Sequence, residues 1–147
     1  MLKQFEGLKK RNLCREEDKR FYKQGDVTIC VVSFNIPQSI FKWNDSLQRL
    51  VERKFPNVVC LWNSIAGQAC PTCTVVAHCS PKKGDKYDEK KGETIAYSKA
   101  QRKMYSITTR ILVLASNWAA EESAKLERAA AFMAMTCDRE QRFIDSL

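Results

Sequence analysis

A long apolar repeat in the C-terminal part of the chain constrains the fold more than any other feature. From residue 96 to residue 118, apolar residues recur at steps of 4, 4, 3, 4, 3 and 4. This spacing keeps one face of an α-helix apolar and is typical of a coiled-coil seam. Asp88 can cap the first turn, and Glu89 suits the positive end of the helix dipole. The repeat consists of Ala96, Ala100, Met104, Ile107, Ile111, Leu114 and Trp118.

A second helix is predicted after a break at Ser116 and Asn117. An alanine-rich segment follows and extends to about residue 143, again with apolar residues at helical spacing. The two helices are expected to form a hairpin over residues 88–145, with Leu126, Ala130, Met133, Cys137 and Ile144 as candidate core residues.

The N-terminal part predicts a small sheet. Residues 27–34, 58–62 and 73–79 are rich in β-branched residues and have the length of strands. Between the first two lies a helical pattern that opens at Pro37 and ends at Pro56, which is consistent with a crossover unit. The second and third strands are expected to pair as a hairpin.

These elements indicate one α+β domain over residues 1–147. It would contain a small three-stranded sheet, a crossover helix and the long C-terminal helical hairpin. Residues 1–25 are polar and charged, and we expect them to form a basic N-terminal arm or helix.

The apolar helix is longer than such a sheet can cover. Strands of five to eight residues span about 17–26 Å, while the helix would span about 40 Å. The remaining surface must pack on the last helix or on another chain. We therefore expect a homo-oligomer, at least a dimer, with an intramolecular hairpin as the alternative.

No export or membrane segment is visible in the sequence. Lys9, Lys10 and Arg11 interrupt the first apolar residues, and the apolar runs of the second half, such as residues 111–115, are short. A bilayer span requires about 20 residues. We expect a cytoplasmic protein without a membrane partner, in the host cytoplasm if a phage encodes it. The seven cysteines are an odd number, which favours free thiols.

Four potential metal ligands lie close together in the sequence. Cys70 and Cys73 form a C-x-x-C pair, and His78 and Cys79 follow shortly. A zinc knuckle would require its last cysteine at position 83, where the chain has lysine. Adjacent residues on a strand also point to opposite faces. We expect no metal, with a zinc-stabilised structural protein as the alternative.

Catalysis is not indicated by any motif. His78 is the only histidine, and no nucleophile elbow, P-loop or dinucleotide fingerprint occurs. The carboxylates of the helices alternate with cations, as in Glu121 and Lys125, a pattern typical of solvated helix faces. We expect a protein that is not an enzyme and uses no cofactor.

The net charge of +8 is concentrated in residues 82–110, which hold nine Lys and Arg against four Asp and Glu. Cations with interleaved tyrosines suit phosphate binding and base stacking, although an ordinary polar helix face is the alternative. The predicted ligand-binding residues are Lys99, Arg102, Lys103, Tyr105 and Arg110 on the helix, with Lys82 and Lys83 in the loop before it.

The sequence from Cys73 to Ala100 has a further pattern. A strand ends in Cys79-Ser80-Pro81 and is followed by Asp85-Lys86-Tyr87-Asp88, Gly92 and Ile95-Ala96. This resembles a strand–turn–helix pattern of small phage and prophage accessory proteins, among them the Thoeris anti-defence sponges. The resemblance implies a protein that sequesters or inhibits a host factor or a nucleotide signal. A nucleic-acid-binding module that uses the basic helix face is the alternative.

Overall fold

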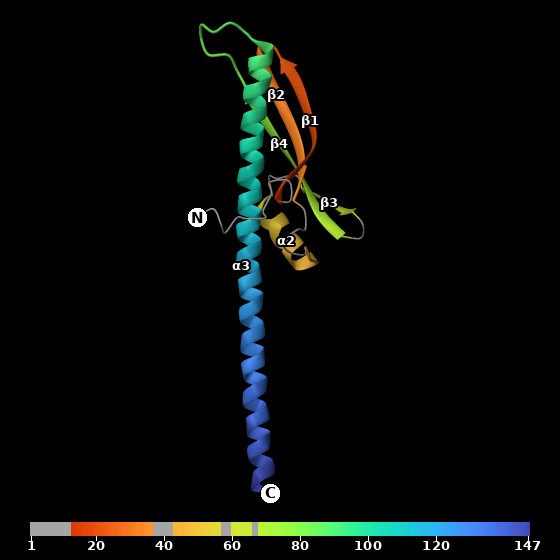
Figure 1. The fold of residues 1–147 in the computed structure, drawn as a ribbon, viewed down its shortest axis with the longest axis vertical. Helices are drawn as coiled ribbons and strands as arrows, with labels where there is room; N and C mark the ends of the chain where they lie inside the picture. The colour runs from red at the N-terminus through yellow and green to blue at the C-terminus, as the bar shows by residue number, and fades with distance from the viewer. Residues whose placement is uncertain (1–12, 37–42, 57–59, 66–67) are drawn as a thin grey trace, which may run out of the picture. The chain divides into compact units, whose positions relative to one another are not determined.

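The computed structural model describes residues 13–36, 43–56, 60–65 and 68–147, without the side chains of residues 60–70. It divides into two compact units, Met1–Ile111 and Leu112–Leu147. The sheet and α2 belong to the first unit, and α3 contributes to both (Figure 1). The elements are β1 (Arg15–Gln24), β2 (Val27–Asn35), α2 (Asp45–Lys54), β3 (Cys60–Ile65), β4 (Gln68–Cys79) and α3 (Glu89–Ser146).

The first unit contains a four-stranded antiparallel sheet in the order β1-β2-β4-β3. The α+β class is therefore confirmed, and the three strands expected from the sequence correspond to β2, β3 and β4. The expected hairpin between β3 and β4 is also present. Because β2 and β3 both run antiparallel to β4, they are parallel to each other. The connection through α2 is thus the predicted crossover.

The prediction of a helix or arm is wrong for β1, which pairs along β2 as a fourth strand. A two-residue turn at Gly25 and Asp26 joins the strands, and Gly25 adopts the positive φ of 61° that such turns require. β1 is an edge strand whose side chains are mostly exposed. Its sequence therefore lacks the alternation of apolar residues that identifies a strand. Residues 1–12 lie outside the described part.

The helix α2 begins later than its sequence pattern suggests. Asn44 is its N-cap, and the side chain of Asn44 accepts a hydrogen bond of 2.9 Å from the backbone N–H of Leu47. Leu47 and Val51 are buried, as the spacing predicted. The expected helix start at Pro37 falls outside the described residues.

The predicted C-terminal hairpin is wrong, because α3 is one helix of 58 residues. Ser116 and Asn117 lie within it without a break. Neither glycine nor proline occurs between residue 93 and residue 147, and serine or asparagine lowers helix propensity by only about 0.5 kcal/mol. The start of the helix agrees with the prediction, since the carboxylate of Asp88 accepts a hydrogen bond from the N–H of Lys91.

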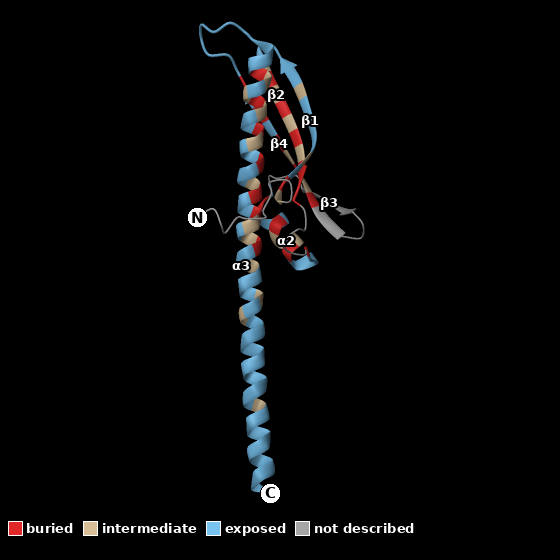
Figure 2. Cartoon of the chain, viewed as in Figure 1, coloured by how far each residue is buried: buried red, intermediate tan, exposed pale blue. Residues whose placement is uncertain are grey.

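The core of the first unit lies between the sheet and the N-terminal half of α3. Buried residues occupy one face of the strands and one face of the helix (Figure 2). Most of the predicted seam is buried here, but the buried line continues through Thr108, while Ile107 is only half-buried. The helix buries Ala96, Ala100, Met104, Thr108 and Ile111, and the strands bury Cys30, Val32, Phe34, Cys73, Val75 and Ala77.

A close approach between α3 and β2 occurs at Gly92. A Cβ atom at this position would lie 2.7 Å from Oγ1 of Thr28, which is shorter than any normal contact. The Thr28 side chain is 1% exposed, and its hydroxyl has no hydrogen-bond partner in the described part of the chain. Glycine at position 92 therefore lets the helix approach the sheet, although glycine costs helix stability.

We predict that Gly92→Ala lowers the free energy of unfolding by about 1–2 kcal/mol, because overpacking outweighs the gain in helix propensity. In a Thr28→Ala background, the same substitution should be neutral or stabilising. Urea denaturation of the four proteins of this double-mutant cycle measures the coupling. Equal effects of Gly92→Ala in both backgrounds would contradict the close approach.

Candidate anion-binding groove

An open groove of about 640 Å³ lies between β4 and the N-terminal half of α3, within the first unit. We call it the basic groove, because four of its eight lining residues are lysine or arginine. The lining consists of Ala77, His78, Lys99, Arg102, Lys103, Ser106, Ile107 and Arg110.

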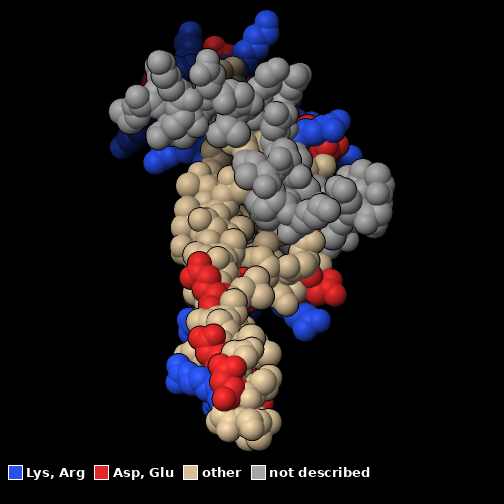
Figure 3. Space-filling view, turned by 60° about the horizontal axis from the view of Figure 1, so that its bottom comes forward, with Lys and Arg blue, Asp and Glu red and all other residues tan. Residues whose placement is uncertain are grey.

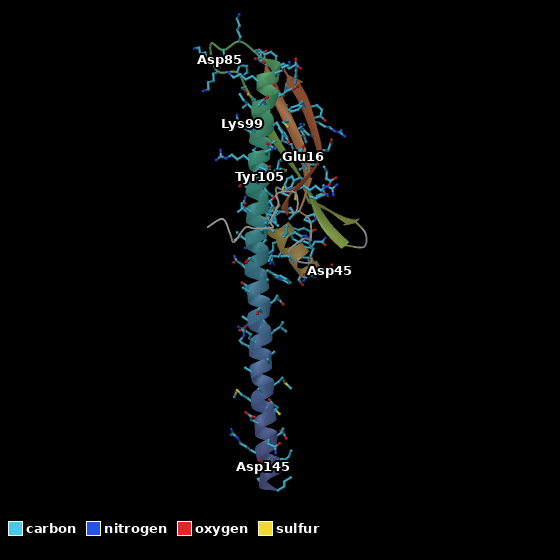
Figure 4. The ribbon with its side chains drawn as sticks, viewed as in Figure 1. Glu16, Asp45, Asp85, Lys99, Tyr105 and Asp145 are labelled. Atoms are coloured by element: carbon cyan, nitrogen blue, oxygen red, sulfur yellow. The ribbon has the colours of Figure 1, made fainter. Side chains whose placement is uncertain are left out.

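Helix periodicity explains why these cations share the groove. Lys99, Lys103 and Arg110 follow one another at steps of four and seven residues, and Arg102 lies one step of three from Lys99. Such residues occupy one side of a helix. This side lies next to the buried one that contains Ala96 and therefore runs beside the sheet; Figure 4 labels Lys99 on this part of α3.

Two of the lysines contact the backbone of β4. Nζ of Lys103 donates a hydrogen bond of 2.6 Å to the carbonyl of Val76, and Nζ of Lys99 donates one of 3.2 Å to the carbonyl of His78. Each ammonium group has three donors, so both lysines keep donors and a positive charge for a ligand.

These carbonyls belong to a sheet edge. β3 pairs with β4 only as far as Cys73, and in the described part of the chain no strand continues this side of β4 beyond it. Lysines commonly cover such edges. The N–H groups of Val76 and His78 point to the same side as their carbonyls and add neutral donors to the groove.

In the described part of the chain, no carboxylate pairs with the cations of the groove. Within the described ranges, none of the four cations lies in an ion pair with Asp or Glu. At the end of the groove, the guanidinium of Arg110 lies 4.9 Å from the ring centre of Phe55, a cation–π contact that orients the arginine without reducing its charge.

The structure unites only some of the predicted ligand-binding residues. Lys99, Arg102, Lys103 and Arg110 meet in the basic groove, whereas Tyr105 and Lys83 do not line it. Lys82 lines a second hollow of about 360 Å³ at the start of α3, which Lys99 shares. Three aspartates of that hollow reduce the positive charge of its lysines. They are Asp26, Asp85 and Asp88, of which Figure 4 labels Asp85.

His78 was missed as a groove residue, because the sequence drew attention to it only as a metal ligand or catalytic base. Its exposed side chain and the buried Cys73 and Cys79 lie on opposite faces of β4. Among the residues that the structure describes, no three His, Cys, Asp or Glu side chains are grouped to hold a metal ion. Cys14, Cys30, Cys79 and Cys137 are free thiols, and burial raises the pKa of Cys14 and Cys30.

Tyr97, another tyrosine of this part of α3, does not line the basic groove. Its hydroxyl donates a hydrogen bond of 2.6 Å to the carboxylate of Glu16, and Nζ of Lys19 lies 4.2 Å from the centre of its ring. The contact joins α3 to β1. The hydrogen bond to Glu16, together with partial burial, raises the pKa of Tyr97 to about 12.

No family model matches the chain, and comparisons with curated proteins and with solved structures found no match. In the part of the chain that the structure describes, no helix is long and apolar enough to span a bilayer.

We predict that Tyr97→Phe lowers the free energy of unfolding at pH 8 by about 1 kcal/mol, because the hydrogen bond to a partly exposed carboxylate is lost. Only the neutral phenol donates. The hydrogen bond therefore stabilises the folded protein fully below about pH 10, the pKa of tyrosine in the unfolded chain. This stabilisation is lost as the pH rises through about 12, the pKa of Tyr97 in the folded protein.

Urea denaturation at pH 8 and at pH 11.5 tests this sign, and the difference between wild type and Tyr97→Phe should shrink at the higher pH. In a Glu16→Gln background, the effect of Tyr97→Phe should be smaller at pH 8. A difference that is the same at both pH values would contradict the assignment.

Proposed function

We propose that the protein is a binding protein that captures a phosphate-bearing ligand in the basic groove. The observation that carries this proposal is the convergence of Lys99, Arg102, Lys103 and Arg110 on one groove without a carboxylate partner in the described chain. Desolvated or clustered cations attract polyanions, and arginine binds phosphate oxygens in a bidentate manner.

Sequestration of a nucleotide signal by a phage accessory protein is one form of this function. The volume of the groove, about 640 Å³, lies within the range of about 300–1,000 Å³ that small-ligand sites occupy. This role involves binding without turnover and agrees with the expectation that the protein is not an enzyme. Inhibition of a host protein would require an acidic surface on that partner.

Nucleic-acid binding is the second form, and the openness of the groove favours it. The cations extend along α3 from residue 99 to residue 110, a distance of about 16 Å at the helical rise, and can contact successive phosphates. The third hypothesis, a zinc-stabilised structural protein, is disfavoured by the placement of His78 and Cys79 on opposite faces of β4.

We predict that the wild-type protein binds phosphate-bearing ligands at low salt and that Arg102→Glu weakens binding at least tenfold, because attraction becomes repulsion. Fluorescence anisotropy at about 50 mM and about 200 mM salt can compare labelled dinucleotides with single-stranded oligonucleotides. Preference for the dinucleotide would support a signal sponge, and preference for the oligonucleotide a nucleic-acid-binding module.

Arg128→Glu is the matched control, because Arg128 is an exposed arginine of α3 in the second unit. It makes the same change in net charge outside the groove. Equal losses in both variants, or no binding of any of these ligands by the wild type, would overturn the proposal.

We also propose that the protein forms a homo-oligomer through residues 112–147. This unit exposes large apolar side chains, and Figure 3 shows wide areas of uncharged surface between its Asp and Glu side chains. Because α3 does not fold back as a hairpin, the intramolecular alternative does not cover them. A second copy offers the same apolar surface. The exposed residues include Leu126, Phe132, Met133, Met135, Phe143 and Ile144.

We predict that Met133→Asp dissociates the oligomer, because a carboxylate would be buried in an apolar interface. Light scattering at micromolar concentration should give at least twice the chain mass of 16.9 kDa for the wild type and the chain mass for the variant. Arg139→Asp, at an exposed polar position of the same helix, is the control and should remain oligomeric. A monomeric wild type would contradict the proposal.

A further inference from the structure

The sheet of the first unit has a second face, directed away from its buried core. Side chains of β2 alternate between buried residues such as Val32 and half-buried residues such as Val31. On β4, the buried Ala77 lies between the exposed Val76 and His78. Because successive side chains of a strand point to opposite faces, the exposed and half-buried residues share the second face.

The strand register arranges this face in rows. Tyr22 pairs with Ile29, and Ile29 pairs with His78, so the three side chains form one row across β1, β2 and β4. The neighbouring row consists of Arg20, Val31 and Val76 by the same register. Tyr22 and Val76 are 50% and 40% exposed, so the described part of the chain leaves them uncovered.

The chemistry of the first row suits flat, aromatic ligands. A phenol ring and an imidazole ring lie at its two ends, with the branched aliphatic side chain of Ile29 between them. Neighbouring strands lie about 4.8 Å apart, so the two rings are separated by about 10 Å. This separation leaves room for more than one base. Nearby, Nε of Arg20 donates a hydrogen bond of 2.8 Å to the carboxylate of Asp18. A side-chain hydrogen bond with Tyr22 raises the pKa of Arg20.

The face meets the basic groove at the edge of β4, where His78 lies. The His78 side chain ends the aromatic row, while its backbone carbonyl accepts a hydrogen bond from Lys99, and the residue lines the groove together with Lys99, Arg102 and Lys103. A ligand that places its bases on the sheet can therefore place its phosphates among the cations. A single-stranded nucleic acid uses both the cations and the two rings.

We infer that the ligand of the basic groove is a single-stranded nucleic acid whose bases stack on the row formed by Tyr22, Ile29 and His78. This inference rests on the proposed function and specifies its substrate class. Stacking on aromatic side chains is tolerant of sequence, so the phosphates and the base planes, rather than particular base edges, are recognised. An extended strand can contact both surfaces with successive nucleotides.

The test compares a fluorescently labelled single-stranded oligonucleotide with an abasic oligomer that carries the same number of phosphates. The wild-type protein should bind the base-bearing strand about tenfold or more tightly than the abasic one, since each stacked base contributes about 1–3 kcal/mol. Equal affinities would overturn the inference but leave the proposed function intact. Absence of binding to both oligomers would overturn the inference, and it would overturn the proposed function as well if the labelled dinucleotide also fails to bind.

Variants locate the stacking surface. Tyr22→Ala and His78→Ala should each weaken binding of the base-bearing strand about fivefold or more, with little effect on the abasic strand, while Tyr22→Trp should retain binding because it keeps a flat ring. Arg102→Glu should weaken binding of both strands. If neither alanine variant changes the affinity for the base-bearing strand, the bases bind elsewhere and the inference is wrong. Thermal denaturation of each variant verifies that the first unit remains folded.

Discussion

The packing of the N-terminal half of α3 on one face of the sheet is the interaction on which the rest of the first unit depends. Small side chains make it possible: Ala96 and Ala100 are fully buried, and a Cβ atom at Gly92 would lie only 2.7 Å from Oγ1 of Thr28. Because the helix lies so close to the sheet, the ammonium groups of Lys99 and Lys103 reach the backbone carbonyls of β4.

The unequal lengths of β3 and β4 create the surface that these lysines cover. β4 has 12 residues and β3 has six, and among the described residues their pairing extends as far as Cys73. The remaining edge of β4 presents backbone donors and acceptors beside a line of cations. An open edge of this kind invites unwanted strand pairing. Lysines that satisfy its carbonyls reduce this hazard and at the same time concentrate positive charge, so one arrangement serves both stability and binding.

The second unit presents a different physical problem. Residues 112–147 are helical, but Leu126, Met133 and Ile144 remain 72%, 61% and 58% exposed. In most proteins, helical stability comes from packing of an apolar face rather than from propensity. A helix with this much exposed apolar surface is therefore suited to a partner, and the proposed oligomer would provide one.

The sequence alone determined the α+β class, the strand segments of β2, β3 and β4, the helix cap at Asp88 and the cationic side of α3, because each depends on local propensity or periodicity. Tertiary structure decided what depends on distant partners. β1 is a strand because it pairs with β2. The hydroxyl of Tyr97 donates a hydrogen bond to Glu16, and Tyr97 does not line the basic groove. His78 lines the same groove as Arg102 only because α3 lies beside β4. The single long α3 shows the limit of local signals: serine and asparagine permit a break, but only a favourable fold-back contact would have produced one.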